Sequence, residues 1–215
     1  MEVHVLCSPG RECSMSRSEH WNDVYTRKAA NDLSWFQPEA TVSLELIRAA
    51  QLAPMASILD VGAGASTLVD GLLASGYRDI TLFDVAHSAL AMTHARLGDG
   101  PIHYEIADIT RWQPKRSYDL WHDRAVFHFL TSASDRDAYR AVLSRAVPPG
   151  GHVIIATFAD DGPERCSGLP VQRYSENELA KELGSLLRPI ETRRQSHTTP
   201  SGAEQRFLFA RFQRI

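Results

Sequence analysis

Residues 57–67 read SILDVGAGAST, and this stretch decides the fold. Its first five residues form a short, mainly apolar run bounded by a glycine turn, which predicts a buried strand over 57–61. Gly62 and Gly64 lie in the turn, and a helical pattern over 67–74 follows. Glycine lets the backbone turn sharply and approach a ligand closely. A strand, a glycine turn and a helix in this order are typical of the ligand-binding edge of an open α/β sheet.

Strands and helices alternate on both sides of this stretch. Helices are predicted over 20–28 and over 38–52, the second opened by a proline. Further strands are predicted over 79–84, 102–107, 118–121 and 152–158, and further helices over 88–97 and 135–146. This alternation predicts an α/β fold with a doubly wound, mostly parallel sheet in three layers, α/β/α.

The end of the chain breaks the alternation. The stretch 175–186 is predicted to be a helix, with Ser175 and Glu178 placed as a capping box. Two strands, 190–197 and 206–212, follow with only a short polar loop between them. Because strands joined by a short loop pair antiparallel, the sheet is predicted to end in an antiparallel hairpin.

Size and composition limit the class of protein. The 215 residues predict a disordered tail over 1–17 and one domain over 18–215. A net charge of −3 and a pI of about 6.3 leave no broad basic field, so nucleic acid is not an expected partner. The three cysteines suggest no disulfide framework. No bilayer-spanning run or secretory signal is evident, so a cytoplasmic location without a membrane partner is expected. No Cys or His spacing matches a metal site.

Asp60 ends the first predicted strand, directly before the glycine turn. A carboxylate there would repel a pyrophosphate, which normally lies against the N-terminus of the following helix. Thr67 also stands where a dinucleotide fingerprint has its third glycine or an alanine. Asp60 therefore suits a ligand with an ammonium group, such as S-adenosylmethionine, through a direct contact or a water.

Two more acids lie where the next two predicted strands end: Asp84 is the last residue of 79–84, and Asp108 directly follows 102–107. Asp84 lies 24 positions after Asp60, close to the spacing of an acid that binds ribose hydroxyls. The alternative for Asp84 is an N-cap of the next helix. Asp108 can accept a hydrogen bond from an adenine amino group, and its alternative is a plain turn aspartate.

With these residues the chain resembles the class I S-adenosylmethionine-dependent methyltransferases, from the helix before Ser57 to the C-terminus. The family has a glycine turn after an acid-ending strand, acids that match Asp84 and Asp108, and a turn like the Pro-Pro-Gly-Gly at 148–151. The resemblance implies a seven-stranded sheet with an antiparallel last strand, and a helical lid over 18–53. It also implies these cofactor-binding residues: Asp60, Gly62, Ala63, Gly64, Asp84, Val85, Asp108, Ile109 and Asp123.

Two features resemble different branches of this family. The Asp-Arg-Ala step at 123–125 is similar to the Asp-Arg-Gly step of thiopurine-type methyltransferases. The aromatic-rich opening over 20–37 is similar to a branch that includes lysine methyltransferases of translation factors. The methyl acceptor, a small molecule or a protein, therefore stays open, as does the oligomeric state.

Methyl transfer from a sulfonium is an in-line displacement, so the enzyme chiefly aligns the acceptor and excludes water. The end of the fourth strand faces the donor methyl in this architecture. The catalytic candidates are His122, Asp123, Arg124 and, as a base, His128. The alternatives are a core position for His128, an ion pair of Arg124 with Asp119 or Asp123, and a cofactor contact for Asp123.

Two further groups are candidates for lining an acceptor pocket. The first is aromatic and precedes the core: Trp21, Tyr25, Trp35 and Phe36. The second lies in the loop after the fifth strand: Asp160, Asp161, Arg165, Cys166 and Tyr174. The alternatives are that the aromatic group only packs a helix onto the sheet, and that Cys166 is a small half-buried residue.

The leading hypothesis is an S-adenosylmethionine-dependent methyltransferase of a small molecule. A protein-lysine methyltransferase is the alternative within enzymes, and a narrow acidic acceptor channel would favour it. A nicotinamide-dependent oxidoreductase is disfavoured by Asp60, Thr67 and the terminal hairpin. A binding module that keeps the cofactor site without turnover is the third class.

Overall fold

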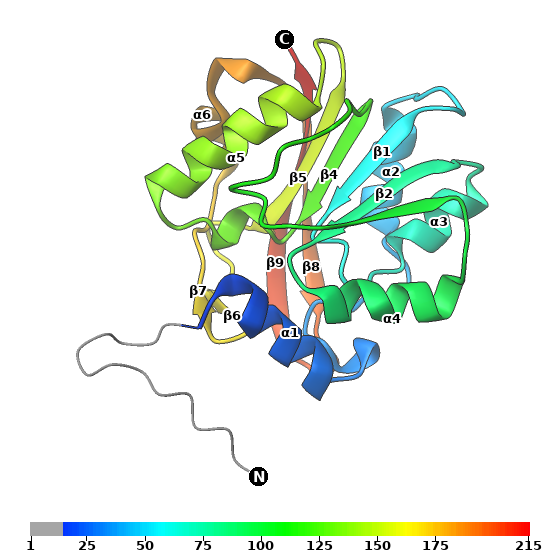
Figure 1. The fold of residues 1–215 in the computed structure, drawn as a ribbon. Helices are drawn as coiled ribbons and strands as arrows, with labels where there is room; N and C mark the ends of the chain where they lie inside the picture. Colours follow the sequence, from blue (N-terminus) through cyan, green and yellow to red (C-terminus); the bar gives the residue numbers. More distant parts are fainter. Residues whose placement is uncertain (1–14) are drawn as a thin grey trace, which may run out of the picture.

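The computed structural model describes residues 15–215, and a seven-stranded sheet runs through the centre (Figure 1). The strand order is β3 (Ile102–Ile106), β2 (Asp79–Asp84), β1 (Ser57–Val61), β4 (Leu120–Arg124), β5 (His152–Phe158), β9 (Glu204–Arg214) and β8 (Leu187–Thr198). The first five strands are parallel, and β9 runs antiparallel to both β5 and β8. The predicted doubly wound sheet with its antiparallel terminal hairpin is therefore confirmed.

Helices cover both faces of the sheet, and each face has its own hydrophobic core. One face carries α2 (Thr41–Ala49), α3 (Leu68–Ala74) and α4 (His87–Leu97); the other carries α5 (Ala133–Ala146) and α6 (Glu176–Leu183). Successive side chains of a strand point to opposite faces. Ile58 of β1 therefore joins the core under α2 and α3, whereas Leu59 and Val61 join the core under α5. The same alternation decides where the polar residues at the strand ends point.

Shorter elements complete the chain. They are α1 (Arg17–Arg27), the 3-10 helices η1 (Ala30–Asp32), η2 (Phe127–Phe129) and η3 (Gly184–Leu186), and a small hairpin of β6 (Arg165–Cys166) and β7 (Leu169–Pro170). No helix joins β3 to β4. The connection is instead held by Ile109, Trp112 and Tyr118, which are buried in the core on the α5 side.

The helix α1 lies across the edge at which the parallel strands end, next to α4 (Figure 1). Its Ser18 hydroxyl donates to the carbonyl of Val85, 3.1 Å away. The Asn22 amide oxygen accepts from the backbone and hydroxyl of Ser88, at 3.0 and 2.9 Å. These bonds attach α1 to the residues that follow β2. The helix therefore forms one wall of any binding site at that edge.

The structure corrects two predicted boundaries next to this edge. α2 begins at Thr41 and not at Pro38, because Ala40 has a non-helical backbone with φ −83° and ψ 56°. β4 spans 120–124 and not 118–121. Its pairing with β1 continues through Asp123, and its pairing with β5 continues through Arg124. The residues predicted to follow the fourth strand therefore lie on it.

A third correction concerns the start of α1. The tail predicted over 1–17 lies mostly outside the described residues. Ser16, however, caps α1: its hydroxyl accepts from the amide of Glu19, and the Glu19 carboxylate accepts from the Ser16 amide at 2.8 Å. Arg17 is therefore the first residue of a helix and not part of a tail. The capping box predicted at Ser175 is confirmed.

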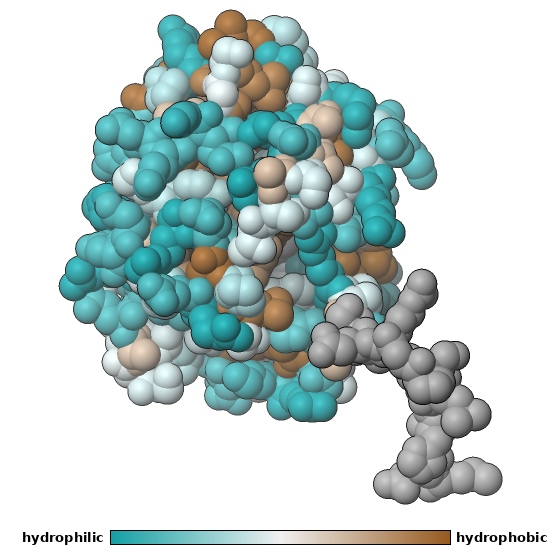
Figure 2. Space-filling view, turned by 90° about the vertical axis from the view of Figure 1, so that its left-hand side faces the viewer, coloured by the Kyte–Doolittle hydropathy of each residue, from teal (hydrophilic) through white to brown (hydrophobic). Residues whose placement is uncertain are grey.

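Two kinds of feature are absent from the described part of the chain. Across residues 15–215, no helix combines the length and apolar character needed to cross a membrane. The same residues include no group of three or more His, Cys, Asp or Glu side chains arranged to hold a metal ion. The face in Figure 2 is mainly hydrophilic, with apolar residues in small groups. The site residues predicted from the sequence lie at the edge where the parallel strands end.

Candidate active site

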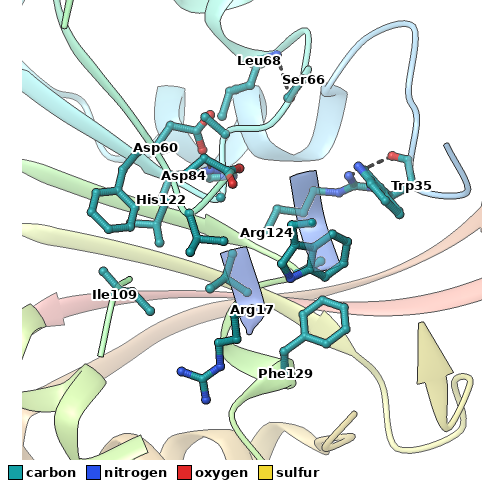
Figure 3. A pocket seen from close by; sticks show the side chains of 18 of the residues that line it. Arg17, Trp35, Asp60, Ser66, Leu68, Asp84, Ile109, His122, Arg124 and Phe129 are labelled. Carbon is teal, nitrogen blue, oxygen red and sulfur yellow. Dashed lines mark hydrogen bonds and ion pairs between the residues drawn. The ribbon is translucent and has the colours of Figure 1, made fainter. Parts of the chain in front are cut away.

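A cavity opens where β1, β2 and β4 end, beneath α1. Its empty volume is about 1030 Å³, including the opening to solvent, which is in the range of small-molecule sites. Nine of the predicted cofactor-binding and catalytic residues line it: Asp60, Gly62, Ala63, Asp84, Val85, Asp108, Ile109, His122 and Arg124. Figure 3 shows Asp60, Asp84 and His122 together at one end of this cavity, with Arg17 and Phe129 toward the other.

The glycine turn is held against β2 and has no room for side chains. Gly62 and Gly64 have φ values of +69° and +55°, a region that L side chains rarely adopt. A Cβ atom on Gly62 would collide with Val126, and one on Gly64 would collide with the hydroxyl of Tyr25. The amide of Gly62 also donates to the carbonyl of Phe83, 2.7 Å away. Both glycines are therefore required by the backbone and by their neighbours.

Asp84 lies at the end of β2 and lines the cavity. Its Oδ2 accepts from the amide of Gly64 and its Oδ1 from the amide of Ala86, both at 2.9 Å. Burial raises the pKa of Asp84 to about 6. Each carboxylate oxygen keeps acceptor capacity, and the side chain faces the cavity. Asp84 therefore offers acceptor oxygens to the cavity, and its two backbone hydrogen bonds also fix the turn around it.

Asp108 is bound on two sides. Its Oδ1 accepts from the amide and the hydroxyl of Thr110, at 2.9 and 2.7 Å, and its Oδ2 lies 3.4 Å from Nη1 of Arg17. Burial would raise the pKa of Asp108, but the Thr110 bonds and the charge of Arg17 outweigh it and lower the pKa. Arg17 also reaches Asp135 of α5, with Nη2 2.5 Å from the carboxylate. Arg17 thus joins α1 both to Asp108, after β3, and to α5.

A buried chain of hydrogen bonds connects α2, β4 and β1. Nδ1 of His122 lies 2.7 Å from Oδ1 of Asp60, and Nε2 lies 2.9 Å from the hydroxyl of Ser43. All three side chains are buried. Because both ring nitrogens are engaged, His122 orients Asp60 and has no free nitrogen with which to accept a proton from a substrate.

Arg124 ends β4 with its guanidinium inside the cavity wall. Nη1 donates to the carbonyl of Trp35 at 3.0 Å (Figure 3), and the guanidinium carbon lies 4.9 Å from the ring centre of Phe207. Burial lowers the pKa of Arg124 to about 10. The ion pair considered with Asp119 or Asp123 does not form: Asp119 accepts from Ser57, and Asp123 points to the opposite face.

Asp123 does not line the cavity, which corrects its prediction as a catalytic or cofactor-binding residue. Its neighbours His122 and Arg124 point to the cavity face, so strand alternation turns Asp123 toward α5. There its carboxylate accepts from the hydroxyl of Tyr139 at 2.6 Å and from the amide of Val126 at 2.9 Å. Asp123 is therefore a structural residue that holds the turn after β4.

His128 is not placed to act as a base, which corrects that prediction as well. Its side chain is fully buried, and its Nδ1 accepts from the amide of Phe158 at 3.2 Å. Burial, with a smaller effect of Arg124, lowers the pKa of His128 to about 3. It does not line the cavity. The geometry therefore supports the alternative, that His128 is a core residue.

The far part of the cavity is walled by aromatic residues from the N-terminal segment. Trp21, Tyr25 and Trp35 line it, together with Cys166 from the β6–β7 hairpin. Trp21 packs edge-on against Trp35 and Phe129, with ring centres 5.7 and 5.0 Å apart. The other loop candidates take different places: Asp160 and Asp161 pair with Arg194.

The residues that shape this cavity and that sequence reasoning missed include Arg17, Ser43 and Phe129. A signal for Arg17 was present, because Ser16 and Glu19 form a capping box that starts a helix there. Ser43 and Phe129 had no such signal. Their roles depend on contacts with residues far away in the chain, His122 and Trp21.

Comparison with known proteins gives the context of this site. Residues 58–151 match a family model described as a methyltransferase domain. The chain is 31% identical over 109 residues to a malonyl-[acyl-carrier protein] O-methyltransferase of Anoxybacillus flavithermus, which covers 50% of this chain and 40% of that protein. The chain spans 40% to 62% of the length of the curated relatives it matches.

Two solved structures share the fold. One is the N-methyltransferase NodS of Bradyrhizobium japonicum in complex with S-adenosylhomocysteine, with a TM-score of 0.67 and 19% identity over 90% of this chain and 97% of that one. The other is a 1,6-didemethyltoxoflavin-N1-methyltransferase of Burkholderia thailandensis, with a TM-score of 0.65 and 22% identity over 92% and 84%. At these identities the likeness concerns the fold.

Proposed function

We propose that the protein is an S-adenosylmethionine-dependent methyltransferase of a small-molecule acceptor. The match of residues 58–151 to a methyltransferase-domain model and the shared fold of the NodS structure support this proposal. The observation that carries the proposal is the arrangement of Asp84 around the glycine turn. Its carboxylate is fixed by two backbone amides and still faces the cavity.

The residues present fit the cofactor along its length. Asp84 accepts from the ribose hydroxyls, and Asp108 accepts from the adenine amino group beside the apolar side chain of Ile109. Asp60 receives the ammonium group of the methionine half, directly or through a water, and His122 holds that carboxylate in place. Gly62 and Gly64 let the backbone approach. The cofactor supplies an activated methyl group on a positively charged sulfur.

The chain contributes alignment and exclusion of water. The segment 18–53 acts as a lid, because Ser18 and Asn22 attach α1 beside the cavity and Arg17 joins it to Asp108 and Asp135. His128 is buried away from the cavity and His122 has both nitrogens occupied. The acceptor is therefore expected to arrive with its nucleophilic atom already free of a proton.

Two alternatives are less favoured by particular residues. A lysine acceptor needs an acidic channel, whereas the acceptor end of this cavity carries the cation of Arg124. A dinucleotide would bring a pyrophosphate to the turn that follows the buried Asp60. The small-molecule proposal also agrees with the Burkholderia enzyme, whose structure contains its small-molecule acceptor, 1,6-didemethyltoxoflavin.

We further propose a cytoplasmic location and one domain over 18–215, to which Arg17, as the first residue of α1, is added. Cys166 is an unpaired, buried thiol among the described residues, which agrees with a reducing compartment.

Calorimetry with S-adenosylmethionine, S-adenosylhomocysteine and NAD tests the proposal. We expect micromolar binding of the first two, no binding of NAD, and a loss of at least about tenfold in Asp84→Ala, since a charged hydrogen-bond partner is worth about 1.5–3 kcal/mol. Asp99→Ala is the matched control, because Asp99 is fully exposed and contacts only His94. Binding of NAD in place of the sulfonium would overturn the proposal.

Turnover is tested next, with labelled S-adenosylmethionine against thiols, amines, acids and cell extract. Transfer of label to a small-molecule fraction is expected. Cofactor binding without transfer to any fraction would favour the non-catalytic binding module instead.

A further inference from the structure

Arg124 has two unused donors in a place where water does not reach them. Its Nε and Nη2 atoms are shut off from solvent and have no hydrogen-bond partner among the described residues. Only Nη1 is bonded, to a carbonyl oxygen. Buried polar groups are nearly always paired, so two orphan donors on one guanidinium need an explanation.

The charge of this guanidinium is also unbalanced. No carboxylate of the described chain forms an ion pair with Arg124, and Asp60, on the same sheet face, is bonded to His122. The side chain rests instead on the ring of Phe207. A buried charge without a partner is strongly unfavourable, which suggests that a partner comes from outside the chain.

The two free donors have the geometry of a binding fork. Nε–H and one N–H of Nη2 lie along the same edge of a planar guanidinium, parallel to each other, and this edge matches the two oxygens of a carboxylate. A single neutral acceptor would satisfy only one of them. The edge belongs to a residue that lines the cavity.

The residues around Arg124 indicate what the rest of the bound molecule is like. Trp35, Trp21 and Phe129 form an edge-to-face aromatic group on the cavity wall, and Cys166 adds a small, buried and weakly polar surface. Such walls favour a flat apolar body. On the basis of the function proposed above, we propose that the methyl acceptor is an apolar, ring-containing carboxylic acid whose carboxylate binds the Nε and Nη2 edge of Arg124.

The same chemistry has a second possible source, because the methionine half of the cofactor also ends in a carboxylate. The experiment must therefore separate cofactor from acceptor. The first arm measures S-adenosylhomocysteine binding by calorimetry in the wild type, in Arg124→Met and in Arg165→Met. Arg165 lies on the β6–β7 hairpin, is exposed and does not line the cavity, which makes it the matched control.

The second arm measures acceptor binding to protein saturated with S-adenosylhomocysteine. The probes are benzoate, phenylacetate and indole-3-acetate, each with its primary amide. We expect the acids to bind at least about tenfold tighter than the amides, and Arg124→Met to lose that preference, because hydrogen bonds to charged groups are worth about 1.5–3 kcal/mol. Arg165→Met is expected to keep it. The first arm is expected to show cofactor affinity unchanged within about threefold in both variants.

Three results would overturn the proposal. They are a loss of S-adenosylhomocysteine affinity in Arg124→Met, equal binding of acids and amides, or no binding of any of the acids. The proposed function survives each of these results, since it depends on cofactor binding by the wild type. If the wild type binds no S-adenosylhomocysteine, the proposed function fails, and the acid titrations on the free protein still test Arg124.

A fold control separates binding from stability. Arg124→Met removes an unpaired buried charge and keeps a side chain of similar length, so its melting temperature is expected to equal or exceed that of the wild type. A clear drop, with the acid preference intact in the folded fraction, would assign Arg124 to the fold and overturn the proposal.

Discussion

His122 and Asp60 join the two central strands of the sheet through a 2.7 Å contact between Nδ1 and Oδ1. The two residues lie opposite each other in the register of β1 and β4, and both are buried. The orientation of the Asp60 carboxylate is therefore set by a residue of β4 as well as by its own strand, β1.

Replacing His122 by alanine is expected to destabilise the protein by about 1–3 kcal/mol, because the buried Asp60 carboxylate and the Ser43 hydroxyl lose their partner. Urea unfolding measures this change. His103→Ala is the control, since that ring is largely exposed. S-adenosylhomocysteine affinity should fall together with stability. An unchanged unfolding midpoint would mean that water replaces the imidazole at no cost.

Gly62→Ala is expected to destabilise the fold more than Gly76→Ala. Both glycines have positive φ, at +69° and +93°, so both variants carry the backbone penalty of about 1–2 kcal/mol. Only Gly62 adds a collision, with Val126, whereas a Cβ on Gly76 meets nothing within 4 Å. The difference between the two unfolding free energies isolates the packing contribution. Equal values would show that Val126 moves aside freely.

The parts of the fold that were predictable are those in which local pattern and tertiary position agree. The bounds of β1, β2 and β5 are as predicted, because each is a largely apolar run that starts and stops at polar or glycine residues. The capping box at Ser175 likewise depends on residues three positions apart. Such signals lie within a few residues of each other.

β4 was predicted too short because its second half is polar. His122, Asp123 and Arg124 have low preference for a central strand, yet each is stabilised there by a residue far away in the chain: Ser43, Tyr139 and Trp35. With the strand ended early, the alternation that separates Asp123 from its neighbours could not be applied. The error at Asp123 therefore follows from long-range hydrogen bonds.

Tyr139→Phe is expected to destabilise the protein by about 1–3 kcal/mol without changing cofactor affinity. The Tyr139 hydroxyl donates to Asp123 at 2.6 Å and accepts from the indole of Trp121 at 2.8 Å. Its loss leaves the indole N–H without a partner and removes one of the hydrogen bonds that the buried Asp123 carboxylate accepts. Tyr104→Phe is the matched control, because the Tyr104 hydroxyl has no partner among the described residues. Unfolding and S-adenosylhomocysteine titrations on both variants check this. A large loss of S-adenosylhomocysteine affinity in Tyr139→Phe would show that Asp123 does contribute to cofactor binding.

The affinity for S-adenosylhomocysteine is expected to fall as the pH drops through about 6. Burial raises the pKa of Asp84 to about 6, and a ribose hydroxyl donates best to the ionised carboxylate. At a pH of about 5 most of this carboxyl is protonated, and we expect affinity about tenfold weaker than at a pH of about 7. Asp84→Asn should bind weakly at both pH values, with a flat profile.

The same ionisation predicts the opposite trend for the fold. A raised pKa means that the folded protein binds this proton more tightly than the unfolded chain does, so the contribution of Asp84 to stability is largest below the unfolded value of about 4 and is lost as the pH rises through about 6. Asp123, also raised by burial to about 6, adds in the same direction. Urea unfolding between these pH values should show wild type gaining stability relative to Asp84→Asn as the pH falls. If the difference between the two proteins does not depend on pH, Asp84 is ionised throughout, and its two backbone hydrogen bonds outweigh its burial.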